Sequence, residues 1–209
     1  MNSPRGETPA IQLAAHAEPM LEATRLAWSW HGHLTRKGRT TSYMSHLTAV
    51  QGIVIQAGGG PEEVMAALLH DALEDAPDVG ERRRREQQIE QKFGSSVLRI
   101  VLDCTDTTPE EAAEAKGPWR QRKERYLEQL RAAAEPSRLV AACDKRHNLG
   151  DLVSDLRHEG AATLDRFNAG ADEQIWYFAS MAEVVRTAVP RWLARELDEL
   201  VGELRRLVG

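Results

Sequence analysis

The sequence predicts an all-α protein, a single helical bundle of about eight to ten helices. Apolar residues recur with helical spacing along almost the whole chain, and alternating strand patterns are scarce. Glycine and proline fall between the periodic segments, where they end or begin helices. The 209 residues, 42% hydrophobic and 28% charged, suit one globular domain. We expect residues 1–8 to form a flexible tail and residues 9–209 to form the domain.

The first half of the chain is punctuated by one polar turn and one glycine run. Residues 36–42 are polar, and glycines 58–60 stop the helix before them. Pro61, followed by Glu62 and Glu63, is typical of a helix N-terminus. We therefore expect helices at residues 11–34, 43–57 and 61–76.

The second half is divided in the same way by Gly94, Pro136 and Pro190, with a polar surface loop at 106–119. The last helix carries an apolar stripe, which predicts packing within the domain or a homodimer interface. The basic run 82–85 is expected to be an exposed helix start without a function. We expect helices at residues 82–93, 95–105, 120–134, 137–158, 173–189 and 190–208.

The composition argues against several classes of protein. A net charge of −5 supplies no broad basic field for nucleic acid, although local cations could still hold a small anion. No apolar stretch is long enough to span a bilayer, and the polar start is not a signal peptide. We therefore expect a cytoplasmic protein that binds neither nucleic acid nor membrane. Cys104 and Cys143 are expected to be buried free thiols.

An unusual concentration of charge follows the apolar run in "AALLHDALEDA", residues 66–76. On a helix that turns about 100° per residue, His70, Asp71, Glu74 and Asp75 project within less than half of the circumference. Packed carboxylates repel one another unless a cation intervenes, and imidazole and carboxylate are ligands for Mn, Fe or Zn. From this helix alone, a metal site and a solvated acidic face remain open.

Two other segments offer the further ligands that a metal needs. His46 lies near the start of an apolar helix, and Asp144 follows a run of small apolar residues. Asn148 and Asp151 share a helix face with Asp144. Singly, His46 is as well explained as a core histidine and Asp144 as a helix-face acid. Together with the pair at 70–71 they complete a set of two histidines and two aspartates from three helices.

These residues resemble the H…HD…D pattern of the HD-domain metal-dependent phosphohydrolases. "HDALEDA" is similar to the HD-x-x-ED motif of the RelA/SpoT hydrolase domain and of the small alarmone hydrolases. Four more blocks resemble that group, in the same order along residues 30–185: "RKGRTTSYMSH", "IEQKFGSSVLRIVLDCTD", "WRQRKERYLEQL" and "DKRHNL". The resemblance implies a helical HD domain.

The resemblance also implies an activity, the hydrolysis of the 3′-pyrophosphate of guanosine tetra- or pentaphosphate, (p)ppGpp, to GDP or GTP and pyrophosphate. The implied cofactor is Mn²⁺, with Fe, Zn and Mg as alternatives. Glu74 and Asp75 would position or deprotonate the attacking water. The implied metal ligands are His46, His70, Asp71 and Asp144. The implied substrate contacts are Arg36, Lys37, Arg122, Lys123, Asn148 and Tyr177.

Three departures from the family pattern leave undecided which nucleotide is the substrate. Ala141 stands where a lysine is frequent, Ala76 where threonine is common, and Glu173 where an arginine is usual. The alternatives are another phosphorylated nucleotide, such as an adenosine alarmone or the 2′-phosphate of NADPH, and a nucleotide-sensing module without turnover. We find no synthetase or regulatory segment, and expect a hydrolase that acts alone.

Overall fold

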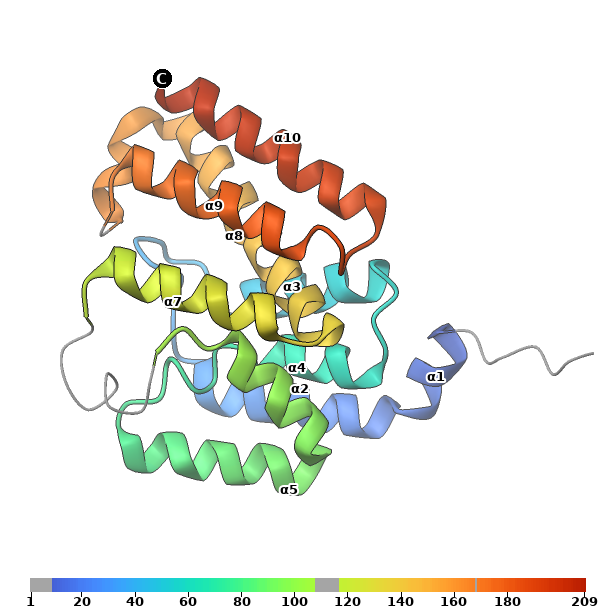
Figure 1. Cartoon of the computed structure of the whole chain (residues 1–209). Coiled ribbons are helices and arrows are strands. Elements are labelled where there is room, and N and C mark those ends of the chain that lie inside the picture. Colours follow the sequence, from blue (N-terminus) through green and yellow to red (C-terminus); the bar gives the residue numbers. More distant parts are fainter. Residues whose placement is uncertain (1–8, 108–116, 168) are drawn as a thin grey trace, which may run out of the picture.

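The computed structural model describes residues 9–107, 117–167 and 169–209. Within these ranges the chain forms nine α-helices and one 3-10 helix, and no β-strand beyond an isolated bridge between Thr35 and Ser42 (Figure 1). The predicted all-α class is confirmed. The predicted tail and most of the predicted loop, residues 108–116, lie outside the described residues.

The helices follow one another in this order: α1 Pro9–Ala15, α2 Ala17–His31, α3 Met44–Gln56, α4 Pro61–Leu69, α5 Val79–Cys104, α7 Trp119–Ala132, α8 Glu135–Glu159, the 3-10 helix η1 Gly160–Arg166, α9 Ala171–Val185 and α10 Arg191–Val208. Most bounds lie within a few residues of those predicted. The helix η1 was not anticipated.

Three local features separate the observed helices from the predicted ones, and a fourth lies where it was predicted. The first long pattern divides at His16, between α1 and α2. Helix α4 ends at Leu69, so residues 70–75 form turns and not a further helical stretch. Helix α5 begins early because Asp78 caps it, accepting a hydrogen bond from the Glu81 amide at 2.8 Å. Gly94, with φ of 85°, kinks α5 at the predicted break.

Helices α4 and α8 occupy the centre of the bundle and so bring distant parts of the sequence together. Helix α4 packs against α2, α3, α5 and α8, and its residues from Val64 to Leu69 are buried. Helix α8 packs against α3 and α5 as well, and against α9 and α10 on its other side (Figure 1). Helix α10 buries an apolar stripe against α8 and α9, formed by Leu193, Leu197, Val201 and Leu204.

The expectation that the basic run is an exposed helix start is wrong for two of its four arginines. Arg82 is 4% exposed and Arg85 is 6% exposed. Arg82 Nη1 donates a hydrogen bond to Thr107 O at 3.1 Å, and Arg85 Nη1 donates to Ala72 O at 2.8 Å. Burial is tolerated because each guanidinium is paired with backbone carbonyls and glutamates. Arg83 and Arg84 are exposed, as expected.

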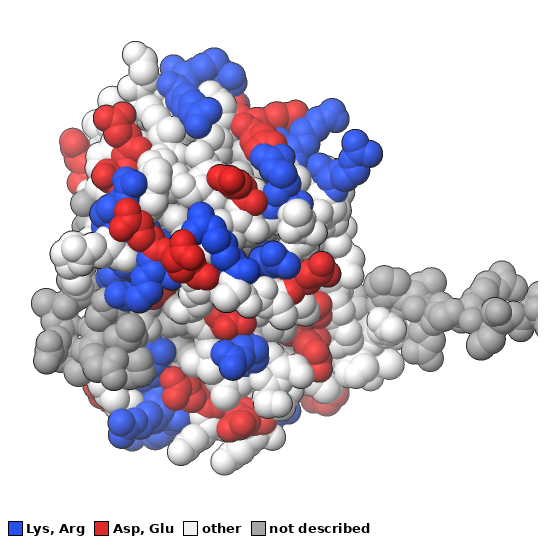
Figure 2. Space-filling model, viewed as in Figure 1, with Lys and Arg blue, Asp and Glu red and all other residues white. Residues whose placement is uncertain are grey.

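Charged side chains of both signs lie on the surface. Basic and acidic side chains are interspersed on the face shown in Figure 2. In the described part of the chain, no helix is long and apolar enough to cross a membrane. Both cysteines are free and buried, as predicted.

Candidate metal centre and adjoining pocket

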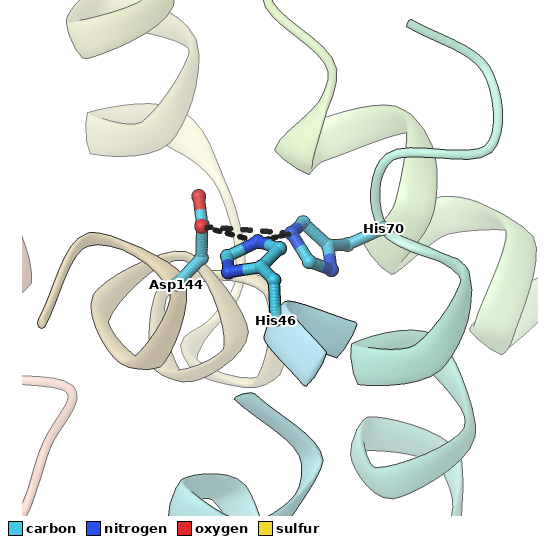
Figure 3. Close-up of side chains that lie close together, drawn as sticks. All are labelled: His46, His70 and Asp144. Atoms are coloured by element: carbon cyan, nitrogen blue, oxygen red, sulfur yellow. Dashed lines mark hydrogen bonds and ion pairs between the residues drawn. The ribbon is translucent and has the colours of Figure 1, made fainter. Parts of the chain in front are cut away.

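His46, His70 and Asp144 meet in the interior, where α3, the end of α4 and α8 come together (Figure 3). The two Nε2 atoms lie 3.3 Å apart. Asp144 Oδ1 lies 3.3 Å from His46 Nε2 and 3.5 Å from His70 Nε2. All three residues are buried, and their facing atoms lie within 4.8 Å of one another. This spacing leaves room for one coordinated cation.

Asp71, the fourth predicted ligand, lies against the same cluster. Its Oδ2 is 3.5 Å from His46 Nε2 and 3.2 Å from His70 Nε2. Tyr43 donates a hydrogen bond to this oxygen at 2.6 Å. Burial, reinforced by the charge of Asp71, raises the pKa of Tyr43, so the phenol keeps its proton and remains a donor. The structure therefore brings all four predicted ligands together.

The histidine ring contacts fit a metal centre. His70 Nδ1 lies 2.8 Å from Ala67 O, which can only accept, so Nδ1 carries a hydrogen and Nε2 is left to face the cluster. His46 Nδ1 contacts His147 Nδ1 at 3.0 Å, which directs its Nε2 to the same point. Two ring nitrogens that face each other with their lone pairs repel unless a proton or a metal cation lies between them. A divalent cation meets that requirement.

The electrostatics of the cluster favour positive charge. Burial opposes ionisation, but Asp71 and Asp144 outweigh it and raise the pKa of His70. Burial likewise opposes both carboxylates. Contacts with His70 and His46 nevertheless lower the pKa of Asp71, and contacts with Lys145, His70 and His46 lower that of Asp144. Both acids are therefore ionised, and with two imidazoles they form a donor set suited to Mn, Fe or Zn.

Two side chains on α8 hold Asp144 in place. Asn148 Nδ2 donates to its Oδ1 at 2.6 Å, and Lys145 Nζ donates to its Oδ2 at 2.5 Å. Although burial opposes the charge of Lys145, Asp144 outweighs it and raises the pKa of that ammonium group. The carboxylate is thus oriented by partners on its own helix.

Glu74 and Asp75 lie on the turns that follow α4, so the expectation of a shared helical arc is wrong. Glu74 is half-buried. The side chain of Asp75 is 32% exposed, and its Oδ2 lies 3.5 Å from Nε2 of the buried His31. Both carboxylates come within five residues of His70 in the sequence, and their catalytic role remains a prediction.

A pocket of about 320 Å³ adjoins the cluster. Five of the six predicted substrate residues line it: Arg36, Lys37, Lys123, Asn148 and Tyr177. Arg122 has a different environment. It is 7% exposed and pairs with Asp106 at 2.9 Å, outside the lining of the pocket.

The pocket combines positive charge with aromatic surface, although the whole chain is acidic. Lys145, Arg39 and Arg166 add to the three predicted cations, while Asp151 and Asp155 are its only acids in the described part of the chain. Arg36 Nη2 donates to Asn148 Oδ1 at 2.9 Å and to Asp151 Oδ2 at 3.2 Å, which ties the first polar turn to α8. The aromatic residues that line the pocket are Tyr43, Trp119, Phe167, Tyr177 and Phe178. Such a lining suits an anionic ligand that carries a ring.

Sequence reasoning did not single out Tyr43, Lys145 or His147, which all contact the cluster. Helical spacing could have found two of them, because Tyr43 precedes His46 by three residues and His147 follows Asp144 by three. Lys145 is adjacent to Asp144 in the sequence.

The sequence model of the HD-domain family matches residues 23–187, which is most of the chain. The chain belongs to the HD-domain family. This HD domain is 32% identical to the guanosine-3′,5′-bis(diphosphate) 3′-pyrophosphohydrolase MESH1 of Xenopus tropicalis over 143 residues, 67% of this chain and 73% of that protein. The human protein of the same name is 31% identical, and the match covers the same shares of the two chains. A Haemophilus influenzae guanosine-3′,5′-bis(diphosphate) 3′-pyrophosphohydrolase is 35% identical across 55% of this chain and 16% of its own length.

Solved structures share the fold of this HD domain. One, described as a metazoan ortholog of SpoT that hydrolyses ppGpp, has a TM-score of 0.67 and 24% identity, and the match covers 88% of this chain and 93% of that one. The protein lmo0812 of Listeria monocytogenes has a TM-score of 0.60 and 27% identity, with 75% and 96% covered.

Proposed function

We propose that this HD domain is a metal-dependent hydrolase that removes the 3′-pyrophosphate of (p)ppGpp, giving GDP or GTP and pyrophosphate. One observation carries the proposal. Tyr43, Lys145 and Asn148 contact the buried histidine–aspartate cluster and also line the cationic pocket. A ligand in that pocket would place its phosphates next to the cluster. The names of the MESH1 proteins and of the Haemophilus influenzae hydrolase support the same substrate.

The cluster would hold one divalent cation through His46, His70, Asp71 and Asp144, and we propose Mn²⁺. When bound, such a cation stabilises the negative charge that develops on a phosphoryl oxygen. The residues around it have separate tasks. Tyr43 holds Asp71, and Asn148 and Lys145 hold Asp144, so the ligand oxygens are fixed before substrate arrives.

The pocket residues would bind the nucleotide and orient its 3′-diphosphate. Lys123 lies 4.8 Å above the ring of Tyr177. Burial lowers the pKa of Lys123, but Tyr177 and Asp106 outweigh it, so the lysine stays charged for contact with phosphate. Arg36 and Lys37 lie on the turn before α3 and would contact the nucleoside by charge or stacking.

Glu74 and Asp75 would handle protons. In the proposed step, water attacks the phosphorus next to the ribose O3′, and one of the two carboxylates takes the proton that water loses. The bond between phosphorus and O3′ breaks, O3′ receives a proton, and pyrophosphate leaves. Each event is a proton or phosphoryl transfer, so no redox partner is needed.

Product analysis tests the proposed bond cleavage. Incubation of guanosine tetraphosphate with the protein and Mn²⁺ should give GDP and pyrophosphate in equal amounts, resolved by ³¹P NMR. Release of orthophosphate, with a guanosine product that still carries a phosphate on the ribose O3′, would mean that a different bond breaks. Metal content tests the ligands independently. His70→Ala should lower the manganese found by elemental analysis, and unchanged metal would contradict the ligand assignment.

A further inference from the structure

The turn that carries the predicted catalytic carboxylates ends a buried helix, and its backbone needs a hydrogen-bond donor. After α4 ends at Leu69, the Ala72 amide donates to Leu69 O at 2.9 Å and the Asp75 amide donates to Asp71 O at 3.0 Å. Ala72 is fully buried, so water does not reach its carbonyl oxygen. A carbonyl at a helix C-terminus in that position must find a partner elsewhere in the protein.

Arg85 supplies that partner from α5, thirteen residues further along the chain. Its Nη1 donates to Ala72 O at 2.8 Å. Its Nε donates to Glu81 at 3.2 Å, and its guanidinium carbon lies 5.1 Å from the ring centre of Trp30. The guanidinium group is therefore fixed by a carboxylate, an aromatic ring and the turn itself. A cation near the carbonyl end of a helix is also favoured electrostatically.

We propose that Arg85 is a positioning residue, which sets the orientation of Glu74 and Asp71 through the backbone of Ala72. The inference rests on the proposed function, because it gives those carboxylates their tasks. Ala72 lies between Asp71 and Glu74, so a backbone shift there displaces both of them. Catalysis is sensitive to such shifts, since a displacement of about 1 Å can cost on the order of a hundredfold in rate.

Helix α5 contains its own matched comparators. Arg82 is buried to the same degree, but its backbone partner is Thr107 O, which is not on the turn. Arg84 is exposed on 68% of its side chain and pairs with Glu81 at the surface. If substitution of a buried arginine only lowers the free energy of unfolding, the variants at Arg82 and Arg85 should behave alike. If it also displaces the turn, only the variant at Arg85 should lose catalytic rate.

The test compares Arg85→Met, Arg82→Met and Arg84→Met, with unfolding temperatures measured first and kinetics expressed per folded protein. We expect both buried substitutions to lower the unfolding temperature. Only Arg85→Met should lower kcat, by about tenfold or more, with KM changed by less than about threefold. Arg85→Lys should recover part of kcat, because an ammonium can still donate to Ala72 O. Equal kcat values in Arg85→Met and Arg82→Met would overturn the proposal.

A second readout does not depend on activity. Hydrogen exchange of peptides covering residues 70–76 should become faster in Arg85→Met and stay unchanged in Arg82→Met. Unchanged protection in Arg85→Met would refute the positioning role even if the hydrolase activity is established. Failure of the unsubstituted protein to hydrolyse guanosine tetraphosphate would instead refute the proposed function, and the exchange comparison would still decide the role of Arg85.

Discussion

His147 Nδ1 lies 3.0 Å from His46 Nδ1, so the ring of a predicted metal ligand is held from the side opposite the cluster. Burial, reinforced by His46, lowers the pKa of His147 to about 4. His147 is therefore neutral at neutral pH and can accept a hydrogen from His46. This bond determines which nitrogen of His46 faces the metal position.

His147→Ala should weaken metal binding. Loss of such a supporting contact typically costs about ten- to a hundredfold in metal affinity. Titration of the metal-free protein with Mn²⁺ alone measures the change. His158→Ala is the matched control, because His158 lies exposed on the same helix. Equal affinity in the two variants would show that His147 does not orient His46.

The double substitution Glu74→Gln and Asp75→Asn should keep the metal and lose turnover. General acid–base catalysis contributes about a hundredfold or more, and both amides lack the basicity to take a proton. Metal content and kcat are measured on the same preparation. Glu90→Gln with Glu128→Gln removes the same charge at exposed positions on α5 and α7. If turnover survives in the first variant as in the control, neither carboxylate has a part in the mechanism.

Lys123 and Arg122 are adjacent on α7 but should respond differently. Lys123→Met should raise KM by about tenfold or more, the equivalent of one hydrogen bond to a charged group. Arg122→Met should chiefly lower the unfolding temperature, because Arg122 is buried in its pair with Asp106 and does not line the pocket. Steady-state kinetics and thermal unfolding separate the two effects. A larger KM change in Arg122→Met would contradict this placement.

Ionised Asp106 should stabilise the folded state, and this contribution should be lost at low pH. Burial alone would raise the pKa of this carboxyl, but Lys123 and Arg122 outweigh it and lower the pKa from 3.8 to about 2. A group whose pKa is lower in the folded state stabilises it above the unfolded value, and this stabilisation is lost as pH falls from about 4 through about 2. The contribution amounts to roughly 2 kcal/mol. Urea unfolding across this range should show a shallower pH dependence in Asp106→Asn, and an unchanged slope would count against the pairing.

The fold, and the four residues that meet in the buried cluster, could be predicted from local patterns. Helical periodicity with glycine and proline breaks identified the helices, and the H…HD…D spacing identified His46, His70, Asp71 and Asp144 before any geometry was known. Periodicity does not show where a helix stops, however. It extended α4 through residues 70–76, whereas the backbone there changes to turns after Leu69.

The contacts that could not be predicted join residues far apart in the sequence. Arg82 and Arg85 look like surface residues in a charged run, and their distant carbonyl partners at Thr107 and Ala72 cannot be read from that run. Arg122 and Lys123 are neighbours in the sequence and both pair with Asp106, but only Lys123 also lines the pocket. Side-chain direction in these cases follows from tertiary packing.

A substrate panel tests the central claim most directly. With Mn²⁺ present, kcat/KM is compared for guanosine tetraphosphate, its adenosine analogue and NADPH. We predict the highest value for guanosine tetraphosphate, with release of pyrophosphate that stops on chelation of the metal. A preference for NADPH with release of orthophosphate, or no hydrolysis of any of the three, would contradict the account.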